Sequence, residues 1–193
     1  TGSNGVAVGY ESQRYANSTA TPWTNYNTSI GYQALRGSTT AADNTGNSNT
    51  AIGYQSLYSN TTGEKNTAQG YASLYKNTTG SYNSVQGYQA LYSNTTGSYN
   101  SAQGVNALYS NTTGIYNSAQ GYASLYKLTG TYNNNTALGY NSGRYYNGTT
   151  GDLTSPSQSL FLGASASALA DSGTNEIVIG YNAIGNGSNS VVL

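Results

Sequence analysis

The sequence of 193 residues contains no cysteine, methionine or histidine, one phenylalanine, one tryptophan and two prolines. Without cysteine there is neither a disulfide nor a zinc–thiolate site. Without histidine the chain lacks the usual general base and the commonest transition-metal ligand. These absences exclude most familiar enzyme classes, so we expect a protein that is not an enzyme and that uses no cofactor and no metal.

Charge is also scarce. Six Lys and Arg balance six Asp and Glu, and charged residues make up 6% of the chain, whereas typical globular domains have roughly 25%. Phosphate backbones are bound by clusters of Lys and Arg, so no nucleic-acid partner is expected. No apolar run reaches the about 20 residues that span a bilayer, so no membrane insertion is expected. The chain starts at Thr without a signal peptide, which indicates a segment of a longer protein that continues beyond it.

Glycine and tyrosine are abundant instead, with 25 and 21 copies, and they recur with a fixed period. Five successive rows begin with a period of 17 and are marked by Gly53, Gly70, Gly87, Gly104 and Gly121. Related rows at less regular intervals, most of them longer, are marked by Gly9, Gly31, Gly139, Gly163 and Gly180. The run 177–179 recurs at 191–193, after a shorter period of 14. Repeats that tolerate insertions at one position indicate stacked supersecondary units.

The pattern within one row predicts β-structure. Residues 84–88 alternate in polarity as a strand does, residues 89–92 form a second short apolar run, and residues 93–97 (SNTTG) have the composition of a turn. Two glycines and many Asn, Ser and Thr in each row disfavour a helix. We therefore predict an all-β solenoid, or β-roll, of coils of 14–24 residues with a core period of 17, each coil built as strand, turn, strand, turn.

Three segments differ in the regularity of these coils. Residues 1–48 form coils with long loop insertions, residues 49–132 form the regular repeat, and residues 133–193 form irregular coils followed by short ones. The insertions are expected to fall after the second apolar run of each coil.

Stacked coils would place equivalent side chains about 4.8 Å apart, so that each column of the sequence becomes a ladder. A leucine ladder is predicted from Leu57, Leu74, Leu91, Leu108 and Leu125, and an amide ladder from Gln69, Gln86, Gln103 and Gln120. Like charges at this spacing repel by about 1 kcal/mol even in water, which explains why charges are rare.

The interior of such a coil holds little more than Ala, Gly and one Leu, so lateral association is expected to add buried apolar area. The residues that flank the small ones on the strands are apolar near both ends of the chain: Val6, Val8, Leu160, Leu162, Ile177 and Ile179. In the middle they are Ser and Gln. We expect this face to contact neighbouring chains in a parallel, intertwined homotrimer; the alternative is that it is solvated in the middle of the rod.

At this point the sequence resembles known fibres. The motifs NGVAVG at 4–9, NEIVIG at 175–180 and NSVVL at 189–193 look like the short head repeat of trimeric autotransporter adhesins, the YadA-like left-handed β-roll. The central rows, such as NSVQGYQALYSNTTGSY at 83–99, are similar to repeats of phage tail fibres and bacterial surface fibres. The resemblance implies an obligate parallel homotrimer, outside the cell or on a virion, that displays a host-recognition surface.

Candidate ligand-binding residues are aromatic and lie in loops, where binding sites concentrate. They are Trp23 and Tyr26 in the insertion at 16–26 with the adjacent Tyr15, the loop column of Tyr82, Tyr99 and Tyr116, and Tyr145 in the insertion at 145–158 with the adjacent Arg144. A structural role is the alternative for each, because tyrosine is a strong strand former that stacks on itself. The Asn-Thr-Thr sequences read either as glycosylation acceptors or as turn formers.

Together these features predict a trimeric, extracellular, cell-surface or virion fibre segment for cell-surface recognition and adhesion. The partners expected are two further copies of the chain and a glycan or protein on a host or prey cell. The alternatives are a purely structural shaft or self-assembling filament without its own receptor site, and an ice-binding solenoid.

Overall fold

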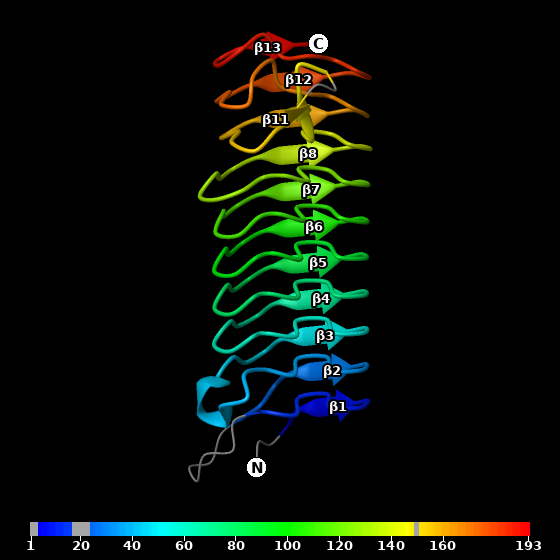
Figure 1. Cartoon of the computed structure of the whole chain (residues 1–193), viewed down its shortest axis with the longest axis vertical. Helices are drawn as coiled ribbons and strands as arrows, with labels where there is room; N and C mark the ends of the chain where they lie inside the picture. The colour runs from blue at the N-terminus through cyan, green and yellow to red at the C-terminus, as the bar shows by residue number, and fades with distance from the viewer. Residues whose placement is uncertain (1–3, 17–23, 149–150) are drawn as a thin grey trace.

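The computed structural model describes residues 4–16, 24–148 and 151–193, which form a column of stacked coils (Figure 1). Each coil gives one short strand to a parallel sheet of 11 strands, in the order β1-β2-β3-β4-β5-β6-β7-β8-β11-β12-β13. The strands are β1 (Val6–Val8), β2 (Thr28–Ile30), β3 (Thr50–Ile52), β4 (Thr67–Gln69), β5 (Ser84–Gln86), β6 (Ser101–Gln103), β7 (Ser118–Gln120), β8 (Thr136–Leu138), β11 (Leu160–Leu162), β12 (Ile177–Ile179) and β13 (Val191–Val192). The predicted all-β solenoid is confirmed.

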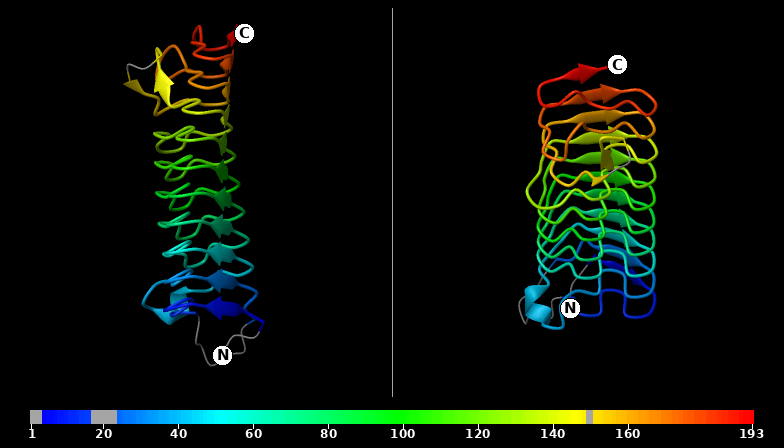
Figure 2. Two further views of the ribbon diagram at one scale, coloured as in Figure 1. Left: turned by 90° about the vertical axis from the view of Figure 1, so that its right-hand side faces the viewer. Right: turned by 45° about the horizontal axis from the view of Figure 1, so that its top comes forward.

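The register of the sheet follows the sequence period. Thr67 pairs with Ser84 and Ser84 with Ser101, which keeps the regular period of 17, whereas Ile177 pairs with Val191 in the shorter period of 14. The longer coils carry their extra residues outside the sheet. One holds the short 3-10 helix η1 (Ala41–Asp43), and another holds the antiparallel pair of β9 (Tyr145–Tyr146) and β10 (Gly151–Asp152), which projects sideways in Figure 2. Among the described residues there is no helix of the length and apolarity that a membrane crossing requires.

The second strand predicted in each coil is absent, and this prediction is wrong. Residues 89–92 form a turn in which Gln89 and Leu91 both adopt a left-handed backbone, each with φ of 50°. The turn still bonds to both neighbouring coils, because the N–H of Gln89 donates to the carbonyl of Tyr71 (2.8 Å) and that of Leu91 to the carbonyl of Ala107 (2.9 Å). An apolar run can therefore make the inter-coil bonds of a sheet without strand dihedrals.

The core of the column is thin and built from ladders. Each regular strand buries only its middle residue, such as Val85 in β5, and the leucine ladder predicted from the sequence is fully buried. The glycine after each strand allows neighbouring coils to approach closely. At Gly87, φ is +139° and an added Cβ would lie 2.3 Å from the carbonyl oxygen of Gly104. Only glycine fits at this position.

A buried ladder of asparagine runs beside the strands, and sequence analysis missed it. It comprises Asn27, Asn49, Asn66, Asn83, Asn100, Asn117 and Asn135, all almost wholly inaccessible. In a typical rung, the side chain of Asn83 donates to Asn66 Oδ1 (3.1 Å) and to the carbonyl of Gly97 (2.9 Å). Its own Oδ1 accepts from the backbone N–H of Asn100 (3.0 Å). Each amide thus satisfies buried backbone groups in two coils.

The Asn-Thr-Thr sequences form a second asparagine ladder. Asn77 donates to Asn60 Oδ1 (2.8 Å) and to the carbonyl of Gly80 within its own turn (2.9 Å). The ladder continues through Asn94 and Asn111, and all four side chains are buried. These four residues are therefore turn formers, and their amide nitrogens are not accessible to a glycosylating enzyme in the folded chain.

Glu176 takes the asparagine position in the coil of β12. Its side chain is fully buried, and neither carboxylate oxygen has a hydrogen-bond partner at bonding geometry. Burial raises the pKa of this carboxyl, and the backbone N–H groups of Leu169 and Gly187 oppose the shift only in part.

The asparagine ladder can be tested against the exposed glutamine ladder. We expect Asn83→Ala to lower the free energy of unfolding by about 2 to 4 kcal/mol, because it leaves the buried backbone N–H of Asn100 without a partner and removes one of the two amide donors to the carbonyl of Gly97. Gln86→Ala removes an amide of the exposed ladder and should cost less than about 1 kcal/mol. Chemical denaturation measures both. Equal losses in the two variants would show that burial of the amides does not matter.

Glu176 predicts a pH dependence of stability. A carboxyl whose pKa is raised in the folded state favours folding below its unfolded pKa, and this contribution is lost as pH rises through the folded pKa. Glu176→Gln should therefore raise the melting temperature at about pH 7, with the difference from wild type shrinking towards about pH 4. Thermal unfolding across this range measures it. A difference in melting temperature between Glu176→Gln and wild type that stays constant with pH would contradict a raised pKa of Glu176.

Candidate functional site

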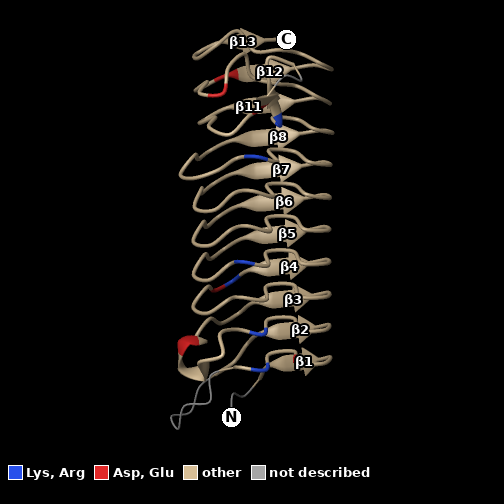
Figure 3. Cartoon of the chain, in the orientation of Figure 1, with Lys and Arg blue, Asp and Glu red and all other residues tan. Residues whose placement is uncertain are grey.

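The exposed side of the regular coils is an array that we call the display face. Along one coil, Tyr82, Ser84, Gln86 and Tyr88 are exposed, and the residues between them are buried or glycine. Four coils give four columns: Lys65, Tyr82, Tyr99 and Tyr116; Thr67, Ser84, Ser101 and Ser118; Gln69, Gln86, Gln103 and Gln120; Tyr71, Tyr88, Val105 and Tyr122. Lys65 is the one charged residue in this array. The 11 strands of the main sheet carry no charge at all, as Figure 3 shows.

The column at the exit of the strands is the outer tyrosine row. Its rings stack with centroids 4.9–5.2 Å apart and planes within 4–14° of parallel, in two runs. The first run holds Tyr10, Tyr32, Tyr54, Tyr71 and Tyr88, and the second Tyr122 and Tyr140. Val105 interrupts the row between the two runs.

The inner tyrosine row lies around the turn from the outer row and comprises Tyr58, Tyr75, Tyr92, Tyr109 and Tyr126. Its rings are half-buried and stack at 4.9–5.2 Å. Desolvation by burial raises the pKa of Tyr75 and Tyr109, and neighbouring phenols add to the shift. An arginine covers each end: Arg36 lies 5.2 Å from the ring centre of Tyr58, and Arg144 lies 4.8 Å from that of Tyr126.

The column that precedes the strands contains the loop tyrosine row of Tyr82, Tyr99 and Tyr116. Successive rings lie 4.9 and 5.0 Å apart, and the side chains are 44%, 48% and 52% exposed. All three have a left-handed backbone with φ of 58–60°, which costs a bulky residue roughly 1–2 kcal/mol. The Nζ of Lys65 donates to the Tyr82 hydroxyl (2.9 Å), and this bond raises the pKa of Lys65.

The stacking decides what these rows offer to a ligand. Neighbouring rings cover one another's faces, so a row presents ring edges and one hydroxyl per coil. The exposed amides repeat with the same spacing, and Gln86 Nε2 donates to Gln69 Oε1 (3.3 Å) as Gln103 Nε2 does to Gln86 Oε1 (3.0 Å). The first three rungs of the predicted amide ladder, Gln69, Gln86 and Gln103, are thus hydrogen-bonded to one another. Such a surface presents hydroxyl and amide groups repeated at the spacing of the coils.

The other predicted site residues have varied surroundings. Trp23 lies outside the described residues. Tyr26 is exposed, and its backbone N–H donates to Asn47 Oδ1 (2.7 Å). Tyr15 is half-buried, with the Arg36 guanidinium 4.8 Å from its ring centre. The structure brings Arg144 and Tyr145 together at 4.8 Å, and Arg144 lies at the same distance from Tyr126. Arg144 therefore continues the inner tyrosine row.

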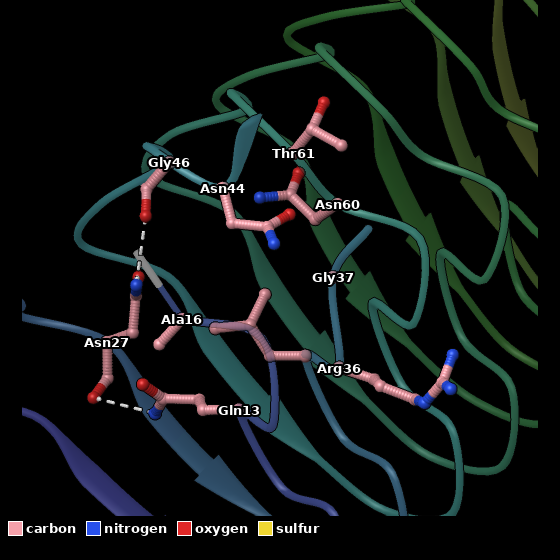
Figure 4. Close-up of a pocket in the computed structure, with 10 residues that line it drawn as sticks. Gln13, Ala16, Asn27, Arg36, Gly37, Asn44, Gly46, Asn60 and Thr61 are labelled. Atoms are coloured by element: carbon pink, nitrogen blue, oxygen red, sulfur yellow. Dashed lines mark hydrogen bonds between the residues drawn. The ribbon is translucent and has the colours of Figure 1, made fainter. Parts of the chain in front are cut away.

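A small pocket near the N-terminal end of the column is shown in Figure 4. Its volume of about 20 Å³ has room for a single water molecule. Polar groups that line it already bond to each other: Asn27 Nδ2 donates to the carbonyl of Gly46 (2.9 Å), and Gln13 Nε2 to that of Asn27 (3.4 Å). We therefore assign it no ligand. Within the part of the chain that the structure describes, no group of three or more acidic side chains is placed to hold a metal ion.

The arginine ends of the inner row were not predicted from the sequence. Arg36 and Arg144 stand five positions after Gly31 and Gly139, where the regular coils have tyrosine. Aligning all coils on their glycines would have placed both guanidiniums at the ends of the tyrosine column.

The interruption of the outer row allows a direct test of stacking. Val105→Tyr should complete the row between Tyr88 and Tyr122 and raise the free energy of unfolding by about 1 to 2 kcal/mol, since an aromatic pair contributes about 0.5–1.5 kcal/mol. Val105→Leu adds apolar bulk without a ring and serves as the control in the same denaturation measurement. A tyrosine variant no more stable than the leucine variant would show that the row gains nothing from stacking.

Comparison with other proteins adds no further assignment. No protein-family model, no curated protein and no solved structure matches this chain. Function therefore has to be argued from the display face and the tyrosine rows alone.

Proposed function

We propose that this chain is a segment of a homotrimeric fibre that recognises glycans on cell surfaces, outside the cell or on a virion tail. The observation that carries the proposal is the set of tyrosine rows. They place exposed phenol hydroxyls at a constant spacing along a rigid and nearly uncharged column. Phenols combine apolar ring edges with a hydrogen-bonding tip, which suits the alternating CH and OH groups of sugars.

Trimerisation is supported by the apolar ends of the strand face. Of the residues predicted for this face, Val6 and Val8 are 48% and 56% exposed in the single chain, and Leu160, Leu162, Ile177 and Ile179 are half-buried. Leu138 and Val191 on the same face are 43% and 63% exposed. Exposed apolar side chains near both ends of a sheet mark an association surface. Two further copies would cover them and add the buried apolar area that a thin coil lacks. In this trimer the two strand columns of the display face, which include the hydrogen-bonded glutamine ladder, would lie in the interface, and the loop and outer tyrosine rows would lie along its two edges.

Glycan recognition is supported by the shape and chemistry of the rows. A regular rod offers a ligand repeated contacts along its length, so an extended polymer with repeated hydroxyl groups can engage several phenols at once. Each contact is weak, but contacts made together multiply, and three copies of each row would increase the avidity further. The low charge also avoids binding any particular anionic or cationic surface through long-range attraction.

The proposal is tested by native mass measurement and by binding to immobilised cell-surface glycans. We expect a trimer that binds, and we expect the triple variant Tyr82→Phe, Tyr99→Phe and Tyr116→Phe to lose at least about tenfold in avidity, because it removes three hydroxyls and keeps the rings. The matched control is Tyr75→Phe, Tyr92→Phe and Tyr109→Phe in the half-buried inner row, which should bind as wild type does.

The other outcomes separate the competing functions. A folded trimer without glycan binding would indicate a structural shaft, which the uninterrupted ladders also favour. A stable monomer would contradict the trimer. Ice binding would appear as thermal hysteresis, but the turn threonines do not favour it: the hydroxyls of Thr61, Thr78 and Thr95 donate to carbonyls of the next coil.

A further inference from the structure

We propose that the loop tyrosine row is a site of oxidative cross-linking, where a peroxidase with hydrogen peroxide joins adjacent coils through dityrosine. This inference is independent of glycan recognition, because it depends only on the chemistry and geometry of Tyr82, Tyr99 and Tyr116. The product would be a covalent bond between one coil and the next, added to the hydrogen bonds that hold the column together.

The composition directs oxidation to tyrosine. Cysteine and methionine are the side chains that oxidants usually attack first, and the chain has neither. It also has no histidine and only one tryptophan, against 21 tyrosines. A phenoxyl radical formed on this chain therefore has few competing side chains to oxidise. Its main reaction partners are other tyrosines.

The loop row holds those partners in contact. The ring centroids of Tyr82 and Tyr99 are 4.9 Å apart with planes 8° from parallel, and those of Tyr99 and Tyr116 are 5.0 Å apart with planes at 16°. Parallel stacking brings the ortho carbons of successive rings near one another. Tyr99 lies between two partners, so it takes part in both possible bonds.

The chemistry balances with the named oxidant. Each of two phenols loses one electron and one proton, and the two phenoxyl radicals form a carbon–carbon bond between their ortho carbons. The hydrogens on those carbons then move to the oxygens, which restores two phenols. The two electrons and two protons reduce one hydrogen peroxide to two molecules of water.

Access separates this row from the inner one, whereas the outer row is as exposed and as closely stacked and is a second candidate that peptide mapping distinguishes. About half of each loop-row side chain is exposed, so a peroxidase or a small radical mediator can reach the hydroxyls. The inner row is half-buried, arginines cover both of its ends, and burial raises the pKa of Tyr75 and Tyr109, which disfavours the more easily oxidised phenolate. The two rows have equal ring spacing and differ in exposure, so the inner row is a matched control.

The experiment treats the purified chain with horseradish peroxidase and hydrogen peroxide, measures dityrosine fluorescence, and maps the bonds by peptide mass spectrometry. We expect bonds 82–99 and 99–116 within one chain and a rise in melting temperature after oxidation. Tyr99→Phe keeps the stack and should remove at least about three-quarters of the dityrosine that peptide mapping assigns to this row, whereas Tyr92→Phe in the inner row should leave it unchanged.

Several results would overturn the assignment. These are an absence of dityrosine in the folded chain, bonds confined to the outer or inner row, bonds only between separate chains, or equal yields from Tyr99→Phe and wild type. Circular dichroism before oxidation confirms that each variant is folded, so a lost bond reports the missing hydroxyl and not a lost structure.

Discussion

The spacing of one strand between successive coils is the constraint on which this structure depends. At about 4.8 Å, a side chain in a regular coil meets the equivalent side chain above and below it. Only residues that tolerate contact with their own kind fit such a column: leucine by apolar packing, asparagine and glutamine by reciprocal amide bonds, and tyrosine by stacking. A charged side chain fails this condition. The near absence of charge and the abundance of a few residue types are therefore two consequences of one distance.

Repetition explains how much of the fold could be predicted. The regular period was sufficient to predict the stacking of the coils, the buried leucine ladder and the glutamine ladder, because each follows from placing equal residues over one another. The buried asparagine ladders were not predicted, since asparagine in a repeat also suits turns and the sequence does not show which amides face inward. The predicted second strand was wrong for a related reason: Gln89 and Leu91 reach both neighbouring coils from left-handed dihedrals, which no polarity pattern records.

The candidate site was predictable in its residue type and less so in its geometry. The sequence showed that the loop column is aromatic and regular. It did not show that stacked rings cover one another's faces and so make those faces inaccessible to a ligand. What remains exposed is a line of edges and hydroxyls, which favours a polymer contacted at several points as the ligand of the proposed site. Arg144 shows the same limit: it was predicted only as a ligand-binding residue of a loop, and its position against Tyr126 and Tyr145 was not predicted from the sequence.

Near-identical rows also create a problem of alignment during folding. The coils that begin at Asn66, Asn83 and Asn100 could pair with a register shift of one coil and lose few contacts, because each side chain in a ladder would still lie next to an equivalent side chain. The coils of unequal length at both ends of the column do not permit this shift, since a displaced longer coil would face a neighbour of regular length. The irregular coils thus fix the register of the near-identical regular coils, so that the chain has a single arrangement.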